Sequence, residues 1–201
     1  RRLASEIMEI GSLPVQAEKA ELWRRLNDRE PVRPVVLIDE EPWGELFQEC
    51  EELKPHCEDP FLKGIERQLQ VCLYRWNHYP VDMVIRPEVE CPMAASSTGI
   101  GITQKGQTVA HDAVTAQHFD AQITGMDDIE KIQMPVVSHN EQETQRRYEV
   151  LSDILDGVAP VRITGRRHIW FTPWDFLIRL VDIKDIMMDL IERPDFVDAV
   201  V

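Results

Sequence analysis

The chain has 201 residues, of which 43% are apolar, a composition that provides a folded core and excludes disordered and collagen-like classes. Its 36 acidic side chains outnumber 22 basic ones and give a formal net charge of −14, which argues against nucleic-acid partners because phosphate-binding surfaces need surplus Lys and Arg. No apolar run approaches the ~20 residues that a membrane-spanning helix requires, so no membrane partner is expected.

The first part of the chain predicts a helical segment followed by a β-α-β unit. Helical periodicity over residues 1–33 ends at closely spaced prolines. The β-branched run 34–38 is typical of a strand buried on both faces, and residues 82–86 predict a second such strand. Between them, apolar residues at three- and four-residue steps predict a helix over 60–79. This order favours a parallel sheet with right-handed crossovers.

Shorter elements are predicted in the second part. Residues 96–125 are rich in Gly, Thr and Val, which predicts a small antiparallel hairpin excursion. Residues 140–156 predict a helix that ends at Gly157, and 160–164 predict a third strand of the main sheet. The remaining predicted elements are a helix over 126–135, an extended segment over 169–174 and helices over 173–180, 184–191 and from 194 onward. Because the chain stops inside a helix, the pattern predicts a fragment of a longer protein.

Polar side chains follow the first two predicted strands. Three acids precede Trp43 at the end of the first strand: Asp39, Glu40 and Glu41. Arg86 and Glu88 hold the same position after the second strand. The loops of an α/β fold converge at the carboxyl ends of strands, so these residues predict a pocket. The alternatives are a solvated acidic turn and a salt bridge at the rim.

Other side chains that could carry chemistry give weaker patterns. The six histidines lack metal-ligand spacing, and Gly99-x-Gly101 lacks the third glycine of a dinucleotide fingerprint. One basic cluster could hold a carboxylate-rich ligand or be a surface patch: Arg162, Arg166, Arg167 and His168. The four cysteines form no CxxC pair and are too sparse for a secreted disulfide scaffold, which predicts a cytoplasmic setting.

Four stretches, in order along the chain, resemble one known family. They are residues 21–35, Asp82-Met-Val-Ile, the helix 124–135, and the segment from Trp170-Phe-Thr-Pro-Trp174 to Val197. Their order is similar to that of the uroporphyrinogen decarboxylase superfamily. The resemblance implies an α/β fold that is the N-terminal half of a (β/α)8 TIM barrel. It divides the chain into a helical segment over 1–33 and the half barrel over 34–201, with the hairpin inserted at about 96–125.

One departure from the family bears on the substrate. The decarboxylases follow their first strand with Arg-Gln-Ala-Gly-Arg, whose arginines hold the carboxylates of the porphyrinogen. This chain has Asp39-Glu-Glu-Pro-Trp43 there, and acids at that position oppose an eight-carboxylate substrate. The sister branch of corrinoid-linked methyltransferases binds zinc through ligands in the C-terminal half of the barrel. The resemblance therefore implies a methyltransferase in corrinoid-dependent methyl transfer.

In this hypothesis Glu88, which aligns with the family's catalytic aspartate, and Asp39 are catalytic. The expected substrate-binding residues are Glu40, Glu41, Trp43, Arg86, Arg162 and Trp174. Zinc and a corrinoid are expected only in the full-length protein, with no metal bound by this chain. The expected partners are a small methylated substrate or a tetrapyrrole, a corrinoid protein and a second copy of the chain in a homodimer.

Two alternatives remain open from the sequence. The first is a decarboxylase in the strict sense, with Glu88 stabilising charge on a pyrrole nitrogen. The second is a non-catalytic fragment or binding module, because half a barrel leaves open sheet edges.

Overall fold

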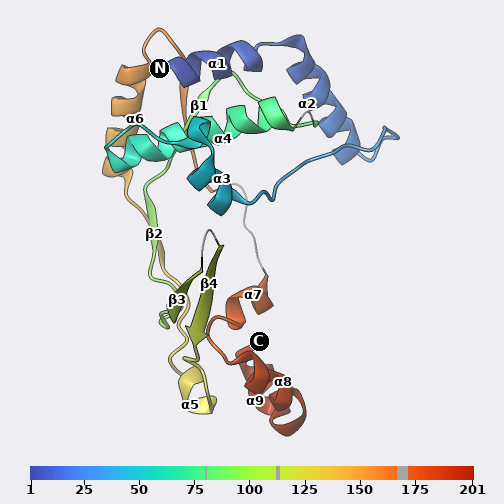
Figure 1. Cartoon of the computed structure of the whole chain (residues 1–201), viewed down its shortest axis with the longest axis vertical. Coiled ribbons are helices and arrows are strands. Elements are labelled where there is room, and N and C mark those ends of the chain that lie inside the picture. Colours follow the sequence, from blue (N-terminus) through green and yellow to red (C-terminus); the bar gives the residue numbers. More distant parts are fainter. Residues whose placement is uncertain (80, 112–113, 167–171) are drawn as a thin grey trace. The chain divides into compact units, whose positions relative to one another are not determined.

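The computed structural model describes residues 1–79, 81–111, 114–166 and 172–201, and it divides into two compact units (Figure 1). Unit 1 comprises Arg1–Met93 and Glu141–Gly165, and unit 2 comprises Ala94–Asn140 and Arg166–Val201. Residues 169–171 of the extended segment predicted at 169–174 lie outside the described residues.

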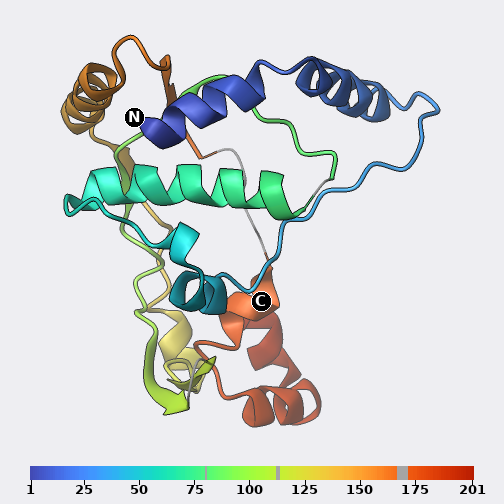
Figure 2. The same cartoon turned by 45° about the horizontal axis from the view of Figure 1, so that its top comes forward.

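Unit 1 is built from helices around one pair of short strands. Its elements are α1 (Arg2–Gly11), α2 (Pro14–Asn27), α3 (Trp43–Glu49), the 3-10 helix η1 (Glu51–Leu53), α4 (Pro60–His78), β1 (Val89–Pro92), α6 (Glu141–Leu155) and β6 (Val161–Thr164). Strands β1 and β6 pair in parallel, with Val89 opposite Val161. Helix α1 lies beside α4 (Figures 1 and 2).

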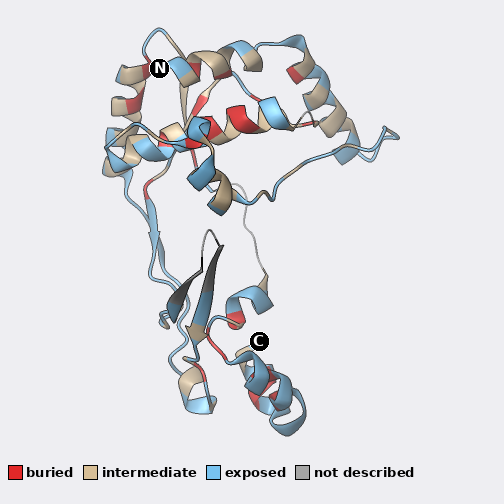
Figure 3. Cartoon of the chain, viewed as in Figure 1, coloured by how far each residue is buried: buried red, intermediate tan, exposed pale blue. Residues whose placement is uncertain are grey.

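The core of unit 1 forms where α1, α4, α6 and β1 meet. Leu69 and Leu73 of α4 are buried at four-residue spacing, and Val89 and Cys91 of β1 are almost fully buried. Figure 3 shows buried positions along the long helix of this unit. Because side chains alternate along a strand, Glu90 and the residues that pair with it lie on the opposite face of β1. The apolar stripe of α4 thus sets which face of β1 carries charge.

Unit 2 contains two antiparallel strand pairs and four short helices among its described residues. Its elements are β2 (Ala95–Ser97), β3 (Lys105–His111), β4 (Val114–Asp120), α5 (Met126–Ile129), β5 (Val137–His139), α7 (Pro173–Leu177), α8 (Ile183–Glu192) and α9 (Pro194–Val200). Strand β2 pairs with β5, and β3 pairs with β4 in the region where the sequence predicts a hairpin. Ile123, Ile186 and Phe196 lie in its core.

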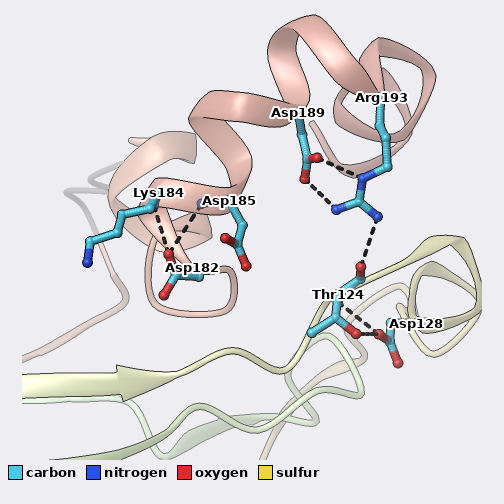
Figure 4. Close-up of polar contacts among 7 residues, drawn as sticks. All are labelled: Thr124, Asp128, Asp182, Lys184, Asp185, Asp189 and Arg193. Atoms are coloured by element: carbon cyan, nitrogen blue, oxygen red, sulfur yellow. Dashed lines mark hydrogen bonds and ion pairs between the residues drawn. The ribbon is translucent and has the colours of Figure 1, made fainter.

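A polar network joins α8 to the loop before α5 in unit 2 (Figure 4). Arg193 donates to both carboxylate oxygens of buried Asp189, at 2.7 and 2.6 Å, and to the carbonyl of Thr124 at 3.2 Å. Thr124 in turn donates to Asp128 through its backbone N–H and its hydroxyl. Asp182 caps α8 by accepting from the N–H groups of Lys184 and Asp185. These bonds fix the register of α8 against the chain near Thr124.

The half-barrel fold is wrong for the described residues. Their strands form three separate two-stranded sheets, with no barrel closure and no repeated β/α pattern. The predicted strand at 160–164 is confirmed as β6, but 34–38 and 82–86 are not strands. The only parallel pairing among the described residues joins β1 to β6, and β1 begins after Glu88 rather than before it.

Residues 34–38 and 82–86 share one backbone hydrogen bond, from the N–H of Asp82 to the carbonyl of Val36 at 3.0 Å, and other backbone groups of these runs bond to side chains. The N–H of Val36 donates to the carboxylate of Asp82 at 3.0 Å, and the N–H of Ile85 donates to the side-chain oxygen of Gln16 at 2.8 Å. Val36 itself is 50% exposed, so the run 34–38 is not a strand buried on both faces. Because buried backbone donors need one acceptor each, these side chains replace the acceptors of a neighbouring strand.

The longer predicted helices are confirmed. Asp59 accepts from the N–H of Leu62 and caps α4, and Gly157, with φ of +69°, follows the end of α6. No helix among the described residues combines the length and apolar character needed to cross a membrane.

The carboxylate of Asp82 predicts acid sensitivity of unit 1. Two hydrogen bonds from the Arg33 guanidinium, then the Val36 N–H, hold the pKa of Asp82 well below its usual range. A lowered folded-state pKa stabilises the fold above the unfolded pKa of about 4, and this contribution is lost as pH falls below that value. We expect the melting temperature of Asp82→Asn to fall less between pH 6 and pH 3 than that of the unmodified chain.

The control is Asp153→Asn, an exposed aspartate of α6. It should keep the full acid dependence. Equal slopes for Asp82→Asn and the unmodified chain would contradict the prediction.

Candidate functional site

Arg162 binds two glutamates near the start of β1: Glu88, which precedes the strand, and Glu90, which lies within it. Its Nε and Nη2 atoms donate to the two carboxylate oxygens of Glu88 at 2.8 and 2.6 Å, and Nη2 also donates to Glu90 at 3.1 Å. Arg86 approaches the same Glu88 oxygen at 3.9 Å. The four side chains form what we call the Arg162 cluster: Arg86, Glu88, Glu90 and Arg162. Two cations and two anions make it formally neutral.

The strand pair positions this cluster. Glu90 and Arg162 are register partners on neighbouring parallel strands, so their side chains leave the sheet side by side. Glu88 lies just before β1, which puts the cluster at the amino ends of the strands. The sequence places Glu88 at a carboxyl end, and this expectation is wrong because residues 82–86 form no strand.

Gly11 fixes the approach of α1 to the segment that carries Arg86. A Cβ atom at Gly11 would lie 2.6 Å from the backbone nitrogen of Pro87 and 2.8 Å from the carbonyl carbon of Arg86. Only glycine therefore allows the two backbones to lie this close without displacement.

Arg75 of α4 organises a second group of predicted residues. It donates to both carboxylate oxygens of Glu41, at 2.6 and 2.7 Å, and to the backbone carbonyl of Asp39 at 3.0 Å. The guanidinium also lies over the ring of Trp43, 5.3 Å from its centre, and the hydrogen bonds to Glu41 raise the pKa of Arg75. The Glu41 side chain is only 2% exposed. This group, the Arg75 cluster, holds the acidic run against α4.

The predicted residues are thus placed in separate groups. Arg86, Glu88 and Arg162 come together, as do the Asp39 backbone, Glu41 and Trp43. The side chains of Asp39 and Glu40 are exposed, and Trp174 belongs to unit 2. Arg167 and His168 of the basic cluster lie outside the described residues.

Sequence reasoning missed Arg75 because it lies between core-facing positions of α4. Cys72 and Trp76 pack against the core on either side of it along the helix. An arginine at such a position is normally assigned to solvent, although the acidic run 39–41 was the available signal of a partner. The same holds for Arg33 and Gln16, whose partners are distant in sequence.

The pKa of the Cys72 thiol is affected by one charged residue from each cluster, Arg75 and Glu90. Burial raises the pKa of its thiol to about 11, with opposing smaller effects from Arg75 and Glu90. A raised pKa disfavours the thiolate at neutral pH, which agrees with the packing of partly buried Cys72 against the core.

No comparison identifies the chain: scans of protein-family models, curated proteins and solved structures find no match. The resemblance to the uroporphyrinogen decarboxylase superfamily stays a prediction from the motifs. Among the described residues, no three His, Cys, Asp or Glu side chains are arranged to hold a metal ion.

The Arg75 cluster predicts a large effect of unpairing a buried carboxylate. Arg75→Met leaves Glu41 buried without its guanidinium and should lower the free energy of unfolding by roughly 2–4 kcal/mol. The double variant Glu41→Leu/Arg75→Met removes both charges and should lose at most about 1 kcal/mol. Urea denaturation followed by circular dichroism measures both. A double variant no more stable than the single one would contradict this account.

Cys72 should resist alkylation in the folded chain. With a pKa of about 11, roughly one thiol in a thousand is ionised at pH 8. In urea the ordinary thiol pKa of about 8.5 returns, so labelling by iodoacetamide should accelerate at least a hundredfold. Peptide mass spectrometry at Cys72 measures the rates. Similar rates in folded and unfolded protein would overturn the prediction.

Proposed function

We propose that this chain acts in corrinoid-dependent methyl transfer, with the Arg162 cluster as part of the site for a small methylated substrate. A corrinoid would supply the cobalt that accepts the methyl group, and Arg86, Glu88, Glu90 and Arg162 would bind and orient the methyl-bearing substrate beside it. The proposal assigns the Arg162 cluster the binding and orientation of the substrate.

The observation that carries the proposal is the charge balance of the Arg162 cluster. Both carboxylate oxygens of Glu88 accept from Arg162, so this guanidinium is already engaged. A polycarboxylate substrate would have to displace these bonds and would meet the negative charges of Glu88 and Glu90. A small methylated substrate that lacks several carboxylates need not displace these bonds and is not repelled by the two glutamates. The cluster therefore favours methyl transfer over porphyrinogen decarboxylation.

The same pairing limits what Glu88 can do. A carboxylate held by two guanidinium hydrogen bonds is stabilised as an anion and oriented rigidly. It is suited to binding a polarised or cationic methyl-bearing group and poorly suited to donating a proton. We therefore assign Glu88 to substrate orientation, with Arg162 as a positioning residue.

The test is an anaerobic assay of the intact protein with tetramethylammonium as the methylated substrate and cob(I)alamin as methyl acceptor. We expect methylation of the corrinoid, followed by its absorbance change. Glu88→Gln should lower the rate by about tenfold to a hundredfold, and Arg162→Lys should lower it as well, because lysine cannot form the paired bonds. Glu18→Gln, an exposed glutamate of α2, is the matched control and should have no effect.

The parallel assay offers uroporphyrinogen without added metal. Efficient decarboxylation would support the decarboxylase alternative and contradict the proposal. Activity in neither assay would contradict it as well and would favour a binding module.

A further inference from the structure

The described residues of unit 2 line an apolar groove with a volume of about 710 Å³. Its walls include Ile100, Ile132, Trp174 and Phe176, and Trp174 and Phe176 are 44% and 51% exposed. This volume lies within the range of small-molecule sites, which are mostly apolar with a few polar groups that orient the ligand. Exposed aromatic side chains at such a groove provide stacking surface for a planar ligand.

Two arginines line the same groove. Arg166 and Arg179 are exposed, and neither forms an ion pair within the described part of the chain. Arg179 makes one contact of another kind, a cation–π approach to the ring of Phe119 at 6.0 Å. Asp175 also lines the groove, so the three charged side chains leave a net positive charge.

The local surplus of positive charge is opposite in sign to the net charge of the whole chain. The chain has a net charge of −14, and several of its other arginines, such as Arg162 and Arg193, are held by carboxylates. Two guanidiniums that have no ion pair among the described residues and lie beside an apolar wall attract an anion more strongly than they would in open water, because the wall lowers the local dielectric. The groove therefore selects for negative charge at one end of an apolar ligand.

We propose that this groove binds a small amphipathic anion: a planar apolar body against Trp174 and Phe176, with a carboxylate or phosphate held by Arg166 and Arg179. This inference does not depend on methyl transfer. It rests on residues of unit 2 alone, whereas the Arg162 cluster belongs to unit 1.

Three probes of the same shape test the proposal on the intact chain by equilibrium dialysis: 2-naphthoate, 2-naphthyl phosphate and neutral 2-naphthamide. Both anions should bind at least about tenfold more tightly than the amide, the value of one charge-assisted hydrogen bond. The stronger of the two anions identifies the preferred head group.

Variants then assign the contacts. Arg166→Gln and Arg179→Gln should each weaken the anions about tenfold and leave the amide unchanged, whereas Trp174→Leu should weaken all three probes. Arg29→Gln, an exposed arginine of unit 1, is the matched control and should change nothing. Equal affinity for the amide and the anions, unchanged anion binding in both arginine variants, or no binding of any probe would each overturn the proposal.

Discussion

Unit 1 depends on how the backbone amides of two apolar runs find acceptors without a sheet. One face of α2 carries Gln16, Lys19 and Trp23 at three- and four-residue steps, and all three bond to the segment 81–85. Gln16 accepts from Ile85, while Lys19 and Trp23 donate to the carbonyls of residues 81 and 82. A helix face thus replaces a strand, and regular pairing begins only at β1.

Arginines decide which of the many carboxylates are fixed. In unit 1, Arg33, Arg75 and Arg162 each grip a carboxylate with two donors, and each joins segments at least 34 residues apart. The planar guanidinium matches the two carboxylate oxygens, so these contacts fix direction as well as distance. In a chain with surplus acid, the arginines are the scarcer partner. These three arginines therefore hold Asp82, Glu41 and Glu88 against segments that are distant in the sequence.

The predictable features are those with local signals. The cap at Asp59 and the left-handed Gly157 mark helix boundaries within a few residues, and α4 and α6 follow. The run 34–38 has the composition of a buried strand. It forms none, and the N–H of Val36 donates to the carboxylate of Asp82, far along the chain. Likewise the sequence nominates Glu88 and Arg162 for a pocket, but their pairing across 74 residues follows from the register of β1 and β6. Non-local partners are what a local pattern cannot specify.

Paired and unpaired arginines lead to different binding behaviour. Arg162 is engaged by two acids, so an incoming anion gains only the difference between its own bonds and those it replaces. Arg166 and Arg179 have no ion pair among the described residues, so an anion entering their groove gains the full charge-assisted contact. The net charge of −14 for the whole chain describes neither the Arg162 cluster nor the groove of unit 2. Both proposals therefore follow from the local pairing of guanidiniums: we propose methylated groups without surplus negative charge as ligands of unit 1, and anions as ligands of unit 2.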